Sequence, residues 1–163
     1  MSRSRKKPVI NKRRAARLAA VQALYQVEVN RQTPEFVVGE FRAHRLPSLL
    51  QPLLPDTPAP DVDGEWFEIV VTGAWAQRKQ LDARLESCLQ TGWSLARCGF
   101  LLRACLRAGA FELAGRTDVP VSVVISEYVE VARLFLDGDE PKFVNAVLDR
   151  LAPQLRDGVE AAG

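Results

Sequence analysis

Positive charge is concentrated at the beginning of the sequence, before the first acidic residue. The first 27 residues hold eight basic side chains, at positions 3, 5, 6, 7, 12, 13, 14 and 17. The whole chain has 22 basic and 20 acidic side chains, so the part from Glu28 onward has a net charge of −6. An acidic body with a flexible basic arm over residues 1–11 predicts a polyanionic partner, with nucleic acid as the first candidate. The alternatives are a solvated tail without function and a mitochondrial transit peptide.

The side chains after this arm have the chemistry that RNA binding needs. Four basic residues are expected to point toward solvent and meet phosphates: Lys12, Arg13, Arg14 and Arg17. Gln22 and Tyr25 follow one to two helical turns later. A glutamine amide can hydrogen-bond to a base edge, and a tyrosine ring can stack on an unpaired base. Taken alone, Tyr25 is better interpreted as an aromatic residue at the edge of the core. Because phosphate contacts are salt-sensitive, we expect a triple replacement of Arg13, Arg14 and Arg17 to weaken RNA binding without lowering the melting temperature.

Residues that could perform catalysis are sparse. His44 is the only histidine, and no phosphate-binding glycine loop or nucleophile motif occurs. Three cysteines, Cys88, Cys98 and Cys105, have neither CxxC nor zinc spacing, and we interpret them as reduced, small buried side chains. We therefore expect a protein that is not an enzyme and that has no cofactor or metal.

One acidic cluster could suggest a metal site. Asp137, Asp139 and Glu140 follow one another closely, but they lack the alternating spacing of a calcium loop. We interpret them as the turn that precedes a helix opened by Pro141.

The elements that would position these residues are all helical. Asn11 can cap a helix from Lys12, with one apolar stripe through Ala16, Ala20 and Val27. A less regular segment over 36–50 precedes a loop at 46–60, which holds five of the ten prolines. One long helix is expected over 63–89, a central helix from Ser94 to Gly115, and two more beginning near residues 118 and 141.

These elements predict an all-α fold. We expect one helical domain over residues 12–155 and a frayed tail over 156–163. No stretch is long and apolar enough to span a membrane, so we expect a cytoplasmic protein without a membrane partner.

Several blocks, in order, carry a resemblance to a known family. The run from Arg13 to Tyr25 is similar to the opening helix of the NusB family of bacterial transcription antitermination factors. Segments 102–103, 111–113 and 118–120 resemble its central helix and turn. Segments 120–127, 130–132 and 142–149 resemble its closing helices. The resemblance covers roughly residues 12–155.

The resemblance implies a fold, a function and a site. The fold would be a single NusB-like helical domain made of two small packed helical bundles. The protein would bind boxA-type single-stranded RNA of ribosomal RNA leaders together with the ribosomal protein NusE, and would help RNA polymerase to resist termination within an antitermination complex. Family RNA contacts map onto the basic first helix, including Gln22 and Tyr25, and onto four residues near the last helix: Asp139, Lys142, Phe143 and Asn145. Three residues are guessed to face NusE: Arg103, Arg107 and Glu112.

Two alternatives stay open on sequence grounds. NusB-like domains also precede ribosomal RNA cytosine methyltransferases. We expect the chain to end at Gly163 without a methyltransferase domain, which argues against that enzyme. A non-catalytic helical RNA/protein interaction module without boxA specificity would bind any polyanion. The protein is expected to be a monomer or a homodimer.

Overall fold

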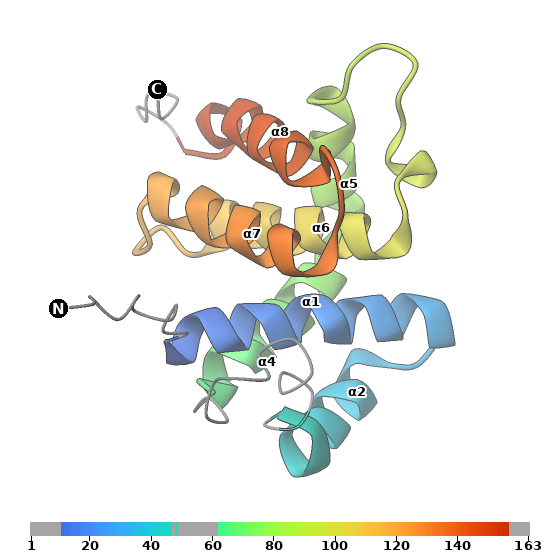
Figure 1. Cartoon of the computed structure of the whole chain (residues 1–163), viewed down its shortest axis with the longest axis vertical. Helices are drawn as coiled ribbons and strands as arrows, with labels where there is room; N and C mark the ends of the chain where they lie inside the picture. Colours follow the sequence, from blue (N-terminus) through green and yellow to red (C-terminus); the bar gives the residue numbers. More distant parts are fainter. Residues whose placement is uncertain (1–10, 47, 49–61, 157–163) are drawn as a thin grey trace, which may run out of the picture.

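A computed structural model describes residues 11–46, 48 and 62–156, and these contain seven α-helices and no strand (Figure 1). The proposed arm over 1–10, nearly all of the proline-rich segment and the tail from 157 lie outside the described residues. Figure 1 shows two groups of helices. One contains α1 (Lys12–Asn30), α2 (Pro34–Glu40) and α4 (Gly64–Ala76). The other contains α5 (Arg78–Ser87), α6 (Phe100–Gly115), α7 (Val121–Phe135) and α8 (Glu140–Leu155). The all-α fold and its two small bundles are confirmed.

Helix α1 lies at the centre of the molecule. The Asn11 side chain accepts a hydrogen bond from Arg14 N at 2.7 Å, so the predicted N-cap is confirmed. α1 contacts α4, α6, α2 and α7, and every residue from Ala15 to Val21 is buried. The expectation of a single apolar stripe is therefore wrong here, because neighbours cover this part of α1 on all sides. Its many alanines permit that close approach.

Close packing against α6 depends on two glycines. A Cβ added to Gly73 in α4 would lie 2.2 Å from the Phe111 ring, and one added to Gly109 in α6 would lie 2.8 Å from Leu148 Cδ1. Both positions admit no side chain without movement of the core. α6 thereby joins the two bundles.

Two predicted helix boundaries differ from the structure. The helix expected over 63–89 is interrupted at Gln77, which leaves the helical region at φ −98° and ψ 9° between α4 and α5. Ser94 stands at the N-cap position of only the short 3-10 helix η2 (Leu95–Arg97), where its side chain makes no capping hydrogen bond, and α6 begins later, after Gly99. The segment expected to be less regular, 36–50, contains in its described part most of α2 and a π-helical turn, η1 (Phe41–Arg45).

The end of α8 is more firmly held than expected. Arg156, which we assigned to the frayed tail, has an exposed fraction of only 8%. Its guanidinium donates to backbone carbonyls at the end of α6 and beyond, including Leu113 O at 2.9 Å and Arg116 O at 2.9 Å. Burial lowers the pKa of Arg156. The domain boundary expected at residue 155 is thus followed directly by a buried arginine, Arg156, that holds the end of α8 against the end of α6. Among the described residues, no helix is long and apolar enough to cross a membrane.

Candidate nucleic-acid interface

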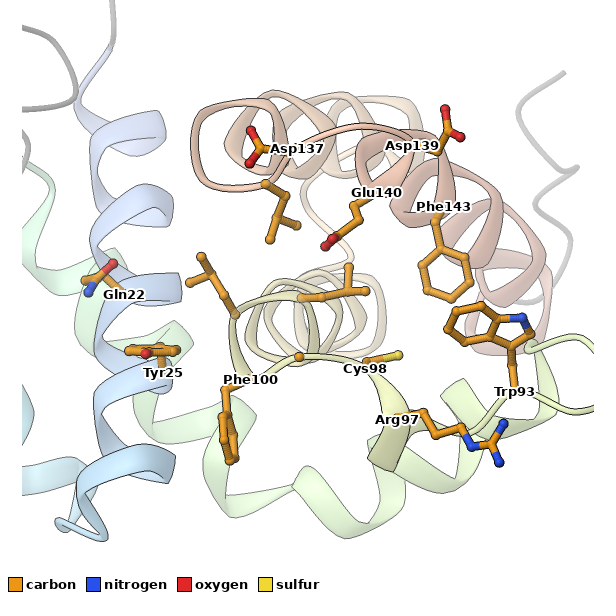
Figure 2. A pocket seen from close by; sticks show the side chains of 14 residues that line it. Gln22, Tyr25, Trp93, Arg97, Cys98, Phe100, Asp137, Asp139, Glu140 and Phe143 are labelled. Carbon is orange, nitrogen blue, oxygen red and sulfur yellow. The ribbon is translucent and has the colours of Figure 1, made fainter.

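A groove of about 940 Å³ lies between α1, α6 and the turn that leads from α7 into α8 (Figure 2). Gln22 and Tyr25 line it from α1. Phe143 lines it from α8, and Asp139 from the turn before α8. These four residues come from distant parts of the sequence, and the fold brings them to one cavity. Four of the predicted RNA contacts are therefore gathered around a single site.

The walls of this groove differ in charge. Asp137, Asp139 and Glu140 all lie along the α7–α8 side, whereas Arg97 lies on the η2 side (Figure 2). Leu101 and Leu102 contribute apolar surface between them. Asp139 occupies the N-cap position of α8, although its side chain makes no capping hydrogen bond. Its interpretation as a turn residue therefore holds for its position; Figure 2 shows its carboxylate pointing away from the groove, whereas the Glu140 carboxylate points into it.

Two other predicted contacts lie elsewhere. Lys142 and Asn145 are exposed and line a separate hollow between α7 and α8, beside Ser126, Glu130 and Arg133. The structure thus divides the predicted set on α8 into Phe143 on the groove side and Lys142 with Asn145 on the other.

The basic residues of α1 have partners inside the protein. The Arg13 guanidinium lies 3.9 Å from the Trp66 ring centroid, and Arg13 itself is exposed. Arg14 donates to the carboxylate of Glu127 in α7, with Nε to Oε2 at 2.7 Å. Hydrogen bonding to Glu127 raises the pKa of Arg14. Lys12 is exposed in the same region. Of these residues, Lys12 and Arg13 offer the more accessible cations.

Arg17 does not point toward solvent, so that expectation is wrong. Its exposed fraction is 2%, and it forms a two-pronged ion pair with Glu112 in α6, with both contacts at 2.8 Å. Trp66 Nε1 donates to the same carboxylate at 3.4 Å, and the Tyr128 hydroxyl donates to it as well. Burial alone would lower the pKa of Arg17, but the hydrogen bonds and charge of Glu112 raise it. Arg17 holds α1 to α6 and α7.

Glu112 is likewise internal. Its exposed fraction is 0%, so it has no surface to offer a partner. The other two residues that we guessed to face NusE, Arg103 and Arg107, line a shallow hollow with Glu28, Asp82 and Phe100.

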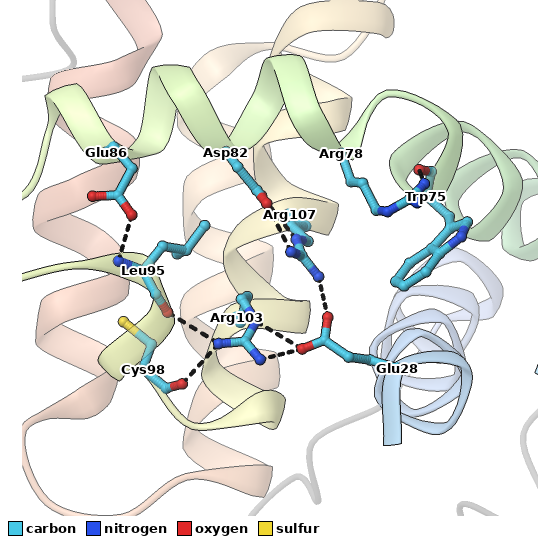
Figure 3. Close-up of polar contacts among 9 residues, drawn as sticks. All are labelled: Glu28, Trp75, Arg78, Asp82, Glu86, Leu95, Cys98, Arg103 and Arg107. Atoms are coloured by element: carbon cyan, nitrogen blue, oxygen red, sulfur yellow. Dashed lines mark hydrogen bonds and ion pairs between the residues drawn. The ribbon is translucent and has the colours of Figure 1, made fainter. Parts of the chain in front are cut away.

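Arg103 and Arg107 form an ion-pair network that joins three helices (Figure 3). Both arginines of α6 donate to Glu28 at the end of α1, and Arg107 also grips Asp82 of α5 at 2.8 and 2.7 Å. Arg103 Nη1 donates to Leu95 O and Cys98 O, each at 3.1 Å. Glu28 lies one turn after Tyr25, so Arg103 links the α1 wall of the groove to the η2 turn. Partial burial alone would raise the pKa of Glu28. The hydrogen bonds from both arginines outweigh that effect, so the pKa of Glu28 is lowered.

Comparison with known proteins decides the family. The model of the NusB family matches residues 14–153. The transcription antitermination protein NusB of Rhizobium rhizogenes is 50% identical over 146 residues, which cover 90% of this chain and 89% of that protein. The one from Bartonella henselae is 47% identical, with 90% of each covered.

This chain belongs to the NusB family. Solved NusB structures agree with the fold. T. maritima NusB matches with a TM-score of 0.64 and 29% identity over 96% of this chain and 95% of that one. A NusB crystallised with NusE and double-stranded RNA matches with a TM-score of 0.66 and 21% identity, over 86% and 96%.

In this NusB-family chain, sequence reasoning missed three groove residues: Trp93, Arg97 and Phe100. Trp93 and Phe100 are 54% and 47% exposed. The available signal for the two aromatic residues was a glycine directly before each: Gly92 precedes Trp93 and Gly99 precedes Phe100. The cysteines were interpreted correctly as buried side chains. Burial raises the pKa of Cys105 to about 12, so its thiol stays protonated and unreactive.

Proposed function

We propose that this protein, a transcription antitermination factor of the NusB family, binds boxA-type RNA of ribosomal RNA leaders together with NusE. One observation supports the RNA site most directly: Gln22, Tyr25, Asp139 and Phe143 line one groove. The chain is also half identical to a relative named as a transcription antitermination protein and not as an enzyme, which agrees with the expectation of a non-catalytic factor. A NusB of the same fold was solved with NusE and double-stranded RNA.

The RNA strand is proposed to run from the start of α1 into the groove. Lys12 and Gln22 are ten residues apart on one helix, which corresponds to about 15 Å along its axis. Lys12 and Arg13 then meet phosphates, while Gln22 and Tyr25 meet bases. The acidic wall repels phosphate, so base amino groups face Glu140 and the rim at Asp139, and the RNA backbone lies on the side of Arg97. Lys142 and Asn145 bind a segment that passes over α8.

NusE is proposed to contact the shallow hollow around Arg103 and Arg107. Glu112 does not contact NusE in this arrangement; it forms the buried ion pair with Arg17. The complex of protein, RNA and NusE joins RNA polymerase in the cytoplasm and helps it to resist termination. The protein acts there as a monomer or a homodimer.

A competition experiment tests the RNA specificity. Labelled boxA-type RNA bound to the protein is titrated with unlabelled boxA RNA, scrambled RNA of equal length, and heparin. We expect boxA RNA to displace the label at the lowest concentration. Equal competition by all three would reject boxA recognition and favour the non-catalytic interaction module that binds any polyanion.

A further inference from the structure

Trp93 exposes a large apolar surface at one end of the groove. It has an exposed fraction of 54%, and its ring centroid lies 5.9 Å from that of Phe143, with the ring planes tilted by 41°. Phe100, also exposed, lines the same groove. Single exposed apolar residues are common on protein surfaces, but a cluster of them at a cavity marks a binding surface.

The turn that carries Trp93 is fixed by hydrogen bonds. Gly92 adopts φ +92°, a conformation that favours glycine. Trp93 N donates to Gln90 O at 3.0 Å, and Arg97 Nη1 donates to Gly92 O at 3.2 Å. The indole is therefore presented on a defined turn, and a ligand that stacks on it meets a largely organised surface.

Two hollows meet at the Trp93–Phe143 pair. The groove lies on one side, and a smaller hollow of about 160 Å³ lies on the other, where Gln90 and Arg150 contribute polar groups. The smaller volume is below the roughly 300–1,000 Å³ of pockets for drug-sized ligands, so it suits a single planar group. Figure 2 shows Trp93 and Phe143 on the opposite side of the groove from Gln22 and Tyr25.

Charge indicates which occupant fits. Arg97 and Arg150 lie near Trp93, whereas Asp137, Asp139 and Glu140 stand on the α7–α8 side. A strand that enters past Gln22 and Tyr25 therefore finds cations for its phosphates beside Trp93, and an aromatic face for its next bases. Stacking on an aromatic ring accepts any base, because every base has a flat face.

We propose that Trp93 is a second base-stacking position, at which an unpaired base of the bound RNA lies against the indole next to Phe143. This proposal rests on the proposed RNA-binding function and extends its site from the groove to the smaller hollow bounded by Arg150. The RNA footprint is then longer than α1 and the α7–α8 turn alone provide.

Binding of a labelled single-stranded boxA-type RNA by three variants tests the proposal. Trp93→Ala is expected to weaken binding roughly 5- to 100-fold, the range that corresponds to the loss of one base–aromatic stack. Trp93→Phe keeps an aromatic ring and should lose much less. The matched control is Phe36→Ala, which removes an equally exposed aromatic residue (55%) from α2 and should leave affinity unchanged.

Tryptophan fluorescence supplies an independent readout. RNA should quench the emission of the wild-type protein and shield it from acrylamide, and both effects should be strongly reduced in Trp93→Phe, where only the buried Trp66 and the partly buried Trp75 remain. Wild-type affinity in Trp93→Ala, with no RNA-dependent change in Trp93 emission, would overturn the stacking proposal and leave the RNA function intact. A wild-type protein that binds no RNA would overturn both.

Discussion

Arg17 and Arg13 show how residues of one type in one basic segment come to serve different purposes. Arg13 is exposed and lies over Trp66, whereas Arg17 is buried against Glu112. Sequence spacing places both on the first helix but does not reveal which side faces α6. The partner carboxylate lies 95 residues further along the chain, so its contact with Arg17 is a property of the tertiary fold.

Single replacements should separate these two roles. Arg17→Ala leaves the Glu112 carboxylate buried without its cation and is expected to cost about 3–5 kcal/mol of unfolding free energy. Arg13→Ala loses only an exposed cation–π contact, about 0.5–1 kcal/mol, and should instead weaken RNA binding. Urea unfolding of both variants measures their stability. Because Arg17 is buried, we no longer expect the triple replacement of Arg13, Arg14 and Arg17 to leave the melting temperature unchanged. Equal stability of the two variants would contradict this assignment.

Glu28 should make part of the stability depend on pH. Its pKa lies below the usual value of 4.5 in the folded protein, so the unfolded chain binds the proton more readily. The resulting stabilisation is fully present above about pH 4.5 and is lost as the pH falls through the lower, folded-state pKa. Glu28→Gln should therefore lower the unfolding free energy by roughly 2 kcal/mol at pH 7. In acid, the unfolding free energies of this variant and the wild type should differ by less. Urea titrations at pH 7 and in the acid range measure this, and a difference that stays constant would refute it.

At the scale of elements, contact between α4 and α6 depends on Gly73. Gly73→Ala places a Cβ into the Phe111 ring and is expected to destabilise the protein by about 1–3 kcal/mol through overpacking. Gly39→Ala in α2 is the matched control, since no atom lies within 4 Å of its added Cβ. At position 39, the better helix propensity of alanine should stabilise the protein by up to about 1 kcal/mol. Thermal unfolding of both variants distinguishes them, and two rises in melting temperature would disprove the close-packing account.

Most elements followed from local sequence signals, and the failures have physical causes. Asn11, Gly115 and Pro141 marked helix ends because capping and proline chemistry act over a few residues. The break at Gln77 was not predicted, since apolar spacing continues through it and no glycine or proline marks it. Of the groove, Gln22 and Tyr25 were predicted from their chemistry and spacing as well as from the family resemblance, and Asp139 and Phe143 through the resemblance alone. Trp93 and Arg97 were missed, because only the fold brings their turn beside α8.

At the scale of the whole molecule, the two bundles meet along α1 and α6, and the groove opens beside this junction (Figures 1 and 2). The Glu112 and Glu28 clusters tie α1 to α6 at two points along that junction. Packing of the bundles and the shape of the groove are therefore linked. RNA that contacts α1 and α8 at the same time would therefore contact both bundles.

The most direct test of the account is the anisotropy of a labelled boxA-type RNA titrated with this protein, with and without NusE from the same organism, at two salt concentrations. We predict a preference over scrambled RNA that tightens when NusE is present, and an affinity that falls as salt rises because phosphates are neutralised by Lys12 and Arg13. Weak binding to both RNAs that does not respond to NusE would contradict the account and leave a NusB fold without boxA recognition.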